Sequence, residues 1–147
     1  MQKHITRIGN HVFVKGALEA VELYKKVFCL EDKGELWLDD SGLLVYRELY
    51  RDGKLFMSVS EDRHVPEKFK TIKFNEGVRP TMMFMVCFSD VEDLFNAYEL
   101  LRCDENPHLE FGVNEDGTIN AGDVFDKFGV YWWLEVPRDW GKSYVPK

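Results

Sequence analysis

Hydrophobic and polar positions along the first half of the chain predict one strand, one helix and three further strands. The segment His11–Lys15, with Val-Phe-Val at its centre, is a short strand that ends at Gly16. The helical stripe that follows repeats apolar residues every three or four positions, at Leu18, Val21, Tyr24, Val27 and Phe28. Three extended segments come next, separated by polar turns that include an Asp-Gly hairpin signal: 34–38, 43–50 and 54–60. The first half is therefore predicted to be β-α-β-β-β.

The second half of the chain repeats this order. Thr81–Phe88 is a strand that is apolar on both faces, and Ser89–Glu92 has the sequence of a capping box. Apolar residues at helical spacing run from Val91 to Leu101 behind it. Three more strands follow, with a hairpin turn at Asn114–Gly117 between the first two: 110–113, 118–120 and 130–136.

The stretch Asp126–Val136 is a polar turn that contains Gly129 and runs into an aromatic strand. Glycine takes a positive φ without steric cost, and bulky residues favour a pleated, buried surface. Side chains alternate along a strand, so Tyr131, Trp133 and Glu135 share one face. A carboxylate among aromatic rings indicates either a ligand pocket or a doubly packed sheet with Glu135 at its wet rim.

The two halves can be laid over one another. His11-Val-Phe-Val matches Phe84-Met-Val-Cys at an offset of roughly 73 residues, half the chain. The predicted fold class is α+β, with tandem βαβββ modules that form curved mixed sheets around a cleft, where small-molecule sites usually lie. We expect residues 1–147 to be one domain of two modules, about 9–60 and 81–136. A connection, 61–80, is either an ordinary surface crossover or a segment that holds a short helix or lies over a pocket, and 137–147 is a tail.

Composition and charge restrict the partners of the protein. The chain has 147 residues, of which 45% are hydrophobic and 14% aromatic, and these values are typical of a globular domain. A net charge of -7 gives no basic footprint for nucleic acid or an anionic membrane. No apolar run approaches the roughly 20 residues of a membrane span or resembles a signal peptide, so we expect a cytoplasmic protein. Cys29, Cys87 and Cys103 suit reduced core thiols.

Four segments resemble one known group of proteins: Gly16–Phe28, Leu55–Ser60, Phe88–Leu94 and Asp126–Leu134. They resemble the vicinal-oxygen-chelate superfamily (glyoxalase, bleomycin-resistance and extradiol dioxygenase proteins), and in particular its PhnB-like branch. The resemblance covers nearly the whole chain. It implies paired modules with a cleft between them, and a homodimer. The methyltransferase label used in that branch does not suit the sequence, because the chain has no glycine-rich turn to hold a methyl-donor cofactor.

Metal-dependent members of the superfamily place His, Glu or Gln ligands on the first and last strands of the modules. The matching positions of this chain fall at His11, Ser58 or Ser60, Phe84 and Trp133. Only His11 is a strong ligand, whereas a catalytic metal generally needs about three protein ligands. Recruiting Glu48 and Glu135 would demand an unusual geometry, so we expect neither a metal nor a cofactor.

Candidate site residues follow from the predicted cleft. A buried histidine near a carboxylate can act as an acid–base pair, which makes His11 and Glu135 the catalytic candidates. The alternative is that His11 only makes an internal hydrogen bond. Carbon-rich walls suit stacking on a planar ligand. The predicted ligand-binding residues are His11, Phe13, Phe56, Ser58, Phe84, Trp133 and Glu135, with Met83 or Met85 beside them.

Three functions remain open on the sequence. The first is metal-independent binding of a small apolar or aromatic molecule in the cleft between the modules. The second is a metal-dependent lyase, isomerase or thiol transferase, which the resemblance and His11 suggest. The third is a dimeric interaction module whose cleft is filled by its own side chains.

Overall fold

A computed structural model describes most of the chain: residues 7–62, 82–104, 112–113 and 119–137. The chain divides into two compact units, residues 1–78 and 79–147. Most of the expected connection, the expected hairpin turn at Asn114–Gly117 and nearly all of the expected tail lie outside the described residues. No helix among the described residues is long and apolar enough to cross a membrane.

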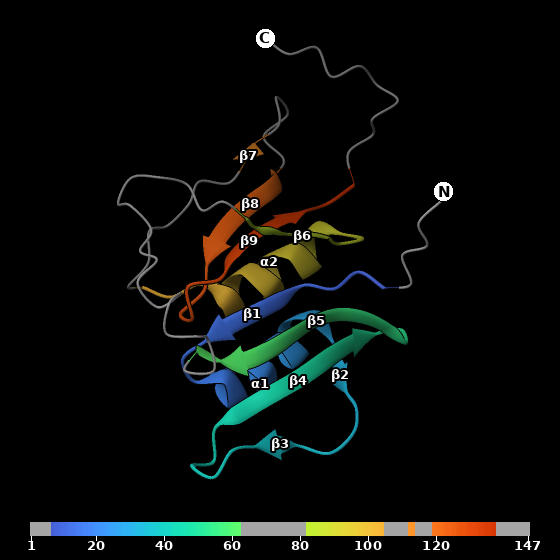
Figure 1. The fold of residues 1–147 in the computed structure, drawn as a ribbon. Helices are drawn as coiled ribbons and strands as arrows, with labels where there is room; N and C mark the ends of the chain where they lie inside the picture. The colour runs from blue at the N-terminus through green and yellow to red at the C-terminus, as the bar shows by residue number, and fades with distance from the viewer. Residues whose placement is uncertain (1–6, 63–81, 105–111, 114–118, 138–147) are drawn as a thin grey trace, which may run out of the picture. The chain divides into compact units, whose positions relative to one another are not determined.

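The first unit is a mixed sheet with one helix packed against it (Figure 1). Its elements are β1 (His11–Val14), α1 (Ala17–Phe28), β2 (Glu31–Asp32), β3 (Trp37–Leu38), β4 (Leu44–Arg51) and β5 (Lys54–Glu61). The strand order is β1-β5-β4-β2, with β3 also paired to β4. β1 and β5 are parallel, whereas the other pairs are antiparallel. The predicted β-α-β-β-β order is confirmed, with the short β2 as an addition.

Helix α1 begins at a turn that another strand completes. Its N-cap is Gly16, which has φ 78° and no side chain that could cap the helix. Glu61 at the end of β5 supplies the missing acceptors, because its carboxylate accepts from Gly16 N at 3.0 Å and from Ala17 N at 2.9 Å. Negative charge at a helix N-terminus is also favoured by the helix dipole. The start of α1 is therefore fixed by a residue more than 40 positions away.

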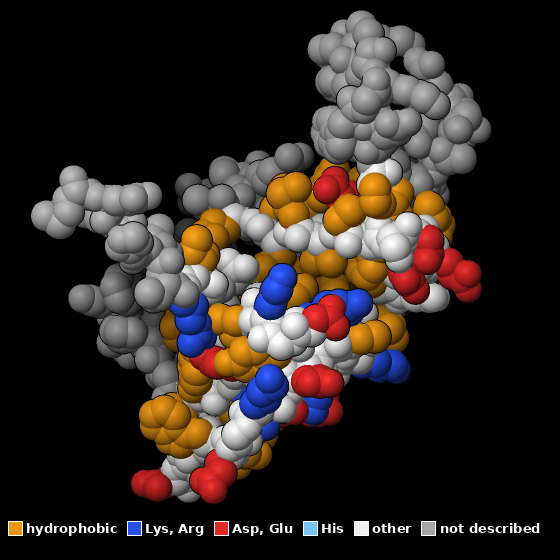
Figure 2. All heavy atoms as spheres, turned by 90° about the vertical axis from the view of Figure 1, so that its right-hand side faces the viewer, with side chains coloured by type: hydrophobic (Ala, Val, Ile, Leu, Met, Phe, Trp, Pro, Cys, Tyr) orange, Lys and Arg blue, Asp and Glu red, His pale blue; other side chains and the backbone are white. Residues whose placement is uncertain are grey.

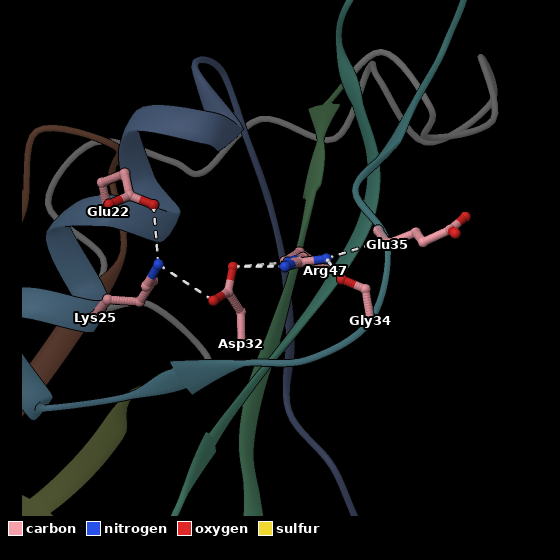
Figure 3. Close-up of polar contacts among 6 residues, drawn as sticks. All are labelled: Glu22, Lys25, Asp32, Gly34, Glu35 and Arg47. Atoms are coloured by element: carbon pink, nitrogen blue, oxygen red, sulfur yellow. Dashed lines mark hydrogen bonds and ion pairs between the residues drawn. The ribbon is translucent and has the colours of Figure 1, made fainter.

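A network of charges ties α1 to the sheet (Figure 3). Arg47 on β4 donates to Asp32 Oδ2 from Nε at 2.9 Å and from Nη2 at 2.7 Å. Its Nη1 reaches the carbonyl oxygens of Gly34 and Glu35 at 3.0 and 2.9 Å. Lys25 on α1 lies 3.2 Å from Asp32 on the other side. Four contacts from one guanidinium thus hold the segment between β2 and β3 against β4.

The second unit has the same plan. Its elements are β6 (Phe84–Cys87), α2 (Val91–Leu101), β7 (Gly112–Val113), β8 (Ile119–Phe125) and β9 (Tyr131–Glu135). The strand order is β6-β9-β8-β7, and the first and last strands are again parallel. Helix α2 packs against β8 and β9, as α1 packs against β1, β4 and β5. Each unit is thus one copy of the predicted repeat, and the α+β fold class is confirmed.

The expected capping box of α2 is wrong by one residue. The N-cap is Asp90, not Ser89, and its Oδ1 accepts from Asp93 N at 2.9 Å. Both residue types cap helices well, and the aspartate also places a negative charge at the positive end of the helix dipole. Buried Leu94, Tyr98 and other apolar residues of the predicted stripe face the sheet.

The turn before β9 is organised by the buried carboxylate of Asp126. Its Oδ1 accepts from Phe128 N at 2.9 Å and from Val130 N at 3.0 Å, and its Oδ2 accepts from Trp132 Nε1 at 2.9 Å. Gly129 has φ 83°, as the sequence predicted. Asp126 and Trp132 are both fully buried. One side chain therefore shapes the turn and anchors the largest ring of the core.

Three further expectations are corrected. The segment 118–120 is only the start of β8, which runs to Phe125. The cysteines are free, as expected, but they are not core residues, because Cys29 and Cys87 are exposed. The alignment of His11 with Phe84 pairs residues on opposite sides of their sheets. In β1 it is Val12, the residue after His11, that is buried beneath α1, whereas in β6 Phe84 itself packs on buried Trp132. Because side chains alternate, a shift of one residue exchanges the two faces of a strand.

Candidate functional site

Each sheet has one face covered by its helix and one face that we call the open face. On the first open face lie five side chains: His11, Phe13, Tyr46, Glu48 and Ser58. Strand register places them together, since His11 and Glu48 both pair with Ser58 across three adjacent strands. Opposed residues of neighbouring strands point to the same side of the sheet. The intervening residues of β1, Val12 and Val14, are buried on the other side.

His11 lies at the centre of the first open face. Its Nδ1 and Ser58 Oγ are 2.7 Å apart and share a hydrogen bond. Its ring stands edge-on to Phe13, with centroids 4.5 Å apart, and stacks on Tyr46 at 5.6 Å with an interplanar angle of 9°. These neighbours keep water from part of the imidazole, and this burial lowers the pKa of His11 below 6.5. The imidazole is therefore neutral at pH 7, and Nε2 has no partner among the described residues.

Glu48 lies beside this aromatic group and is saturated with donors. Tyr46 Oη donates to its Oε1 at 2.8 Å, and Tyr50 and Arg7 also donate to the carboxylate. The hydrogen bond from Tyr50 first, and then those from the other two donors, lower the pKa of Glu48 to about 2. Three of the roughly four acceptor sites of this carboxylate are therefore filled. Its role on this face is therefore to orient the ring of Tyr46 rather than to take up a proton.

The aromatic surface of this face reaches solvent. Phe13 is 51% exposed and Tyr46 is 37% exposed. Trp37 on β3 pairs in register with Tyr46 and is 62% exposed, so it extends the same row of rings. Figure 2 shows one side of the molecule, on which hydrophobic side chains at the surface are interspersed with acidic and basic ones. A row of exposed rings of this kind is typical of a binding surface.

The second open face combines aromatic and acidic side chains. Trp133 Nε1 donates to Glu135 Oε2 at 3.0 Å, which confirms that the two residues share a face. Tyr131 Oη donates to Asp123 Oδ2 at 2.5 Å. Phe125 stacks on Tyr131, with ring centroids 4.4 Å apart. Strand register pairs Asp123 with Trp133, so the two hydrogen-bonded pairs are neighbours.

The structure brings the predicted site residues together in two sets and leaves two of them apart. His11, Phe13 and Ser58 lie on the first open face, and Trp133 and Glu135 on the second. Phe56 instead packs on Phe28 of α1, with centroids 5.2 Å apart. Phe56 has no register partner on β4, because a β-bulge lies between Leu49 and Tyr50. A bulge changes the direction in which a side chain points.

Phe84 is the second predicted residue that is away from the open faces. Its ring lies 4.8 Å from that of Trp132, on the side of the sheet that carries the core. Met85, the next residue, is on the open side and is 63% exposed. The acid–base pairing of His11 with Glu135 stays a prediction, since each has its own partner within its unit.

Sequence reasoning missed several residues of the open faces. Tyr46 and Tyr50 alternate on a predicted strand with Glu48, which was weighed only as a metal ligand, and this period could have placed all three on one face. Asp123 and Phe125 were missed because Ala121-Gly122-Asp123 has a poor strand composition. No local signal marks that segment as part of β8.

The donor groups at the matching metal positions do not fit a divalent ion. Ser58 Oγ is engaged with His11, and Ser60 Oγ donates to Val45 O at 2.7 Å. Phe84 and Trp133 offer no coordinating atom. Among the residues that the structure describes, no three His, Cys, Asp or Glu side chains gather so as to hold a metal ion. We derive no chemical step through a metal.

Comparison with solved structures identifies the fold. A protein from Bacillus cereus described as a putative 3-demethylubiquinone-9 3-methyltransferase, PhnB protein, is 19% identical with a TM-score of 0.61, and the match covers 90% of this chain and all (100%) of that one. A lactoylglutathione lyase from Agrobacterium tumefaciens is 15% identical with a TM-score of 0.51, over 95% of this chain and 99% of that one. The fosfomycin resistance protein FosX from Listeria monocytogenes is 11% identical with a TM-score of 0.56, over 92% and 94%.

These likenesses confirm the predicted fold, the one shared by glyoxalase, PhnB-like and fosfomycin-resistance proteins. The PhnB protein of Bacillus cereus is similar to this chain along almost the entire length of both. No protein-family model matches the sequence, and no curated protein matches it. At these identities the comparisons establish the architecture, and the function has to be argued from the residues.

Proposed function

We propose that the chain binds a small apolar or aromatic molecule on its open faces without the help of a metal ion. The observation that carries this proposal is the row formed by Phe13, His11 and Tyr46 on the first open face. Stacking of one aromatic ring on another contributes about 0.5–1.5 kcal/mol beyond the burial of apolar area. The cleft between the modules stays a prediction from the sequence.

The polar groups around these rings favour a neutral, planar ligand. His11 is neutral at pH 7 and has Nε2 available for one hydrogen bond, because its Nδ1 is used by Ser58. Glu48 is satisfied by its own donors and offers little to a ligand. Sites for small molecules are commonly apolar and aromatic with a few placed polar groups that fix the orientation. The first open face has this composition.

The proposal is tested by a thermal-shift titration of chelator-treated protein with 2-naphthol and with decahydro-2-naphthol, which has the same hydroxyl group but no aromatic ring. At a concentration of about a hundred times the Kd, a ligand stabilises the folded state by about 2.7 kcal/mol. We expect naphthol to raise the melting temperature, and the saturated analogue to raise it much less. Added Zn²⁺ or Mn²⁺ should leave this difference unchanged.

Variants locate the site. Tyr46→Ala should weaken naphthol binding, whereas Tyr46→Phe keeps the ring and should retain it. The matched control is Leu18→Ala, because Leu18 is 39% exposed, nearly as much as Tyr46, but lies on α1. Equal binding by Tyr46→Ala and the control, or binding that appears only with added metal, would refute the proposal.

A further inference from the structure

The second open face presents two carboxylates on either side of an indole ring. Asp123 pairs in register with Trp133, and Glu135 is the next residue of β9 on the same face. Diagonal neighbours on an antiparallel pair are about 7–8 Å apart, so both carboxylates are within reach of a single group bound over Trp133. Phe125 and buried Tyr131, whose ring centroids are 4.4 Å apart, continue the row of rings on one side.

Each of these carboxylates uses only one of its oxygen atoms. Asp123 accepts from Tyr131 through Oδ2, and Glu135 accepts from Trp133 through Oε2. Asp123 Oδ1 and Glu135 Oε1 have no hydrogen-bond partner among the described residues. An ionised carboxylate has about four acceptor sites, so both groups retain capacity for a donor.

Neither carboxylate has a positive partner in the part of the chain that the structure describes. In the first unit, by contrast, Asp32 and Glu48 are both paired with an arginine. Asp123 is only 8% exposed. Burying a charge is costly unless it is paired and hydrogen-bonded, and Tyr131 supplies a neutral donor alone. A cation supplied from outside the described residues would provide the charge partner that this face lacks.

We propose that the second open face binds an organic cation, specifically a protonated primary amine carried by an apolar or planar group. An ammonium has three donors, enough for both free carboxylate oxygens. The face of a tryptophan ring is also the best aromatic partner for such a charge. A bare divalent ion suits the face less well, because it needs several more oxygen ligands than the two that are free. This inference rests on the proposed function, because it assumes that the open faces bind ligands. What it adds is that the ligand of the second open face carries a positive charge.

The experiment compares two probes that differ in charge. The full chain is titrated by calorimetry at pH 7 with 1-naphthylmethylamine, which is protonated, and with 1-naphthalenemethanol, which is neutral and nearly the same shape. We expect the amine to bind about tenfold more tightly, which corresponds to about 1.4 kcal/mol. The advantage should shrink as salt rises from about 0.01 to about 1 M, because screening weakens the attraction of the ammonium to Glu135, the more exposed of the two carboxylates.

Variants assign that advantage to the two carboxylates. Asp123→Asn and Glu135→Gln keep an acceptor for Tyr131 and Trp133 but remove the charge, and each should abolish most of the tenfold preference while leaving the affinity for the alcohol unchanged. The control is Glu92→Gln, which removes the same charge from an exposed position of α2 in the same unit. Should Asp123→Asn fail to fold, Glu135→Gln alone decides.

The outcomes separate this inference from the proposed function. If the alcohol binds and the amine gains nothing, or if the preference survives in both carboxylate variants, the cation site is refuted and the proposed function stands. If the amine binds, the alcohol does not, and Tyr46→Ala has no effect on the amine, the cation site stands and the proposed stacking on the first open face falls. If neither probe binds, both fail.

Discussion

Replacing Asp126 by asparagine should destabilise the second unit more than its small change in structure suggests. The buried carboxylate accepts two backbone N–H groups on Oδ1 and the Trp132 indole on Oδ2. An asparagine has one acceptor oxygen, so it can serve the amides or the indole but not both. Its NH₂ group then faces a buried donor.

The magnitude follows from these contacts. Leaving one buried donor without an acceptor costs about 1–3 kcal/mol, and the remaining hydrogen bonds lose about 1 kcal/mol when their acceptor loses its charge. We therefore expect Asp126→Asn to lower the free energy of unfolding by about 3 kcal/mol, a large part of the roughly 5–15 kcal/mol of a typical domain. Asp126→Ala should cost more, because all three donors lose their acceptor.

The assay is urea unfolding followed by far-ultraviolet circular dichroism, a signal that does not depend on Trp132. With a slope of about 2 kcal/mol per molar urea, the midpoint should fall by about 1.5 M. The same substitution at the exposed cap of α2, Asp90→Asn, is the control and should change the midpoint little, because asparagine caps a helix as well as aspartate does. In a Trp132→Phe background the effect of Asp126→Asn should shrink by about 1–2 kcal/mol, since the indole donor is gone. A loss no larger than that of Asp90→Asn would show that the carboxylate does not organise the turn.

Three further predictions concern the first unit. Glu61→Gln should lower the free energy of unfolding by about 1–2 kcal/mol in urea, because it removes the charge from the N-terminus of α1; no change would show that the helix start is stable without it. Arg47→Met should cost about 2–4 kcal/mol at pH 7, since it leaves Asp32 short of a partner. Burial alone would raise the pKa of Asp32, but the hydrogen bonds from Arg47 and a lysine outweigh burial and lower it. The lowered pKa adds stability that is present above pH 3.8 and is lost in acid. The stability of the Arg47→Met variant should therefore fall less steeply than that of the wild type as the pH drops. The pKa of His11 is lowered by burial, so wild-type stability should fall as the pH drops below 6.5, and His11→Asn should flatten that part of a pH series.

The sequence predicted the fold well because its signals are local. Alternation along the last strand placed Trp133 and Glu135 on one face, and their hydrogen bond confirms it. The start of α1 was not predictable in the same way, because its acceptor, Glu61, comes from a distant strand. Phe84 was assigned to the pocket by an alignment that was one residue out, and on a strand one residue is the difference between core and surface.

The candidate site was only partly predictable for a related reason. Whether a carboxylate is available for binding depends on what contacts it, and the sequence shows no contacts. Glu48 is occupied by its donors, whereas Asp123 is buried with a tyrosine alone. The first was weighed only as a metal ligand of unusual geometry, and the second lies in a segment without a strand signal.

The parallel pairing of the first and last strand in each unit has a consequence for how the protein is made. Pairing of β1 with β5 joins residues 47 positions apart, as His11 and Ser58 show, whereas β4 and β5 meet through a two-residue turn. Contacts between near neighbours form quickly, and loop closure over a long separation comes later. The first sheet, however, needs no residue beyond Glu61 for its strand pairing. During synthesis it can therefore close on itself while β6 is still inside the ribosome, so that the two similarly built halves do not compete for each other's strands.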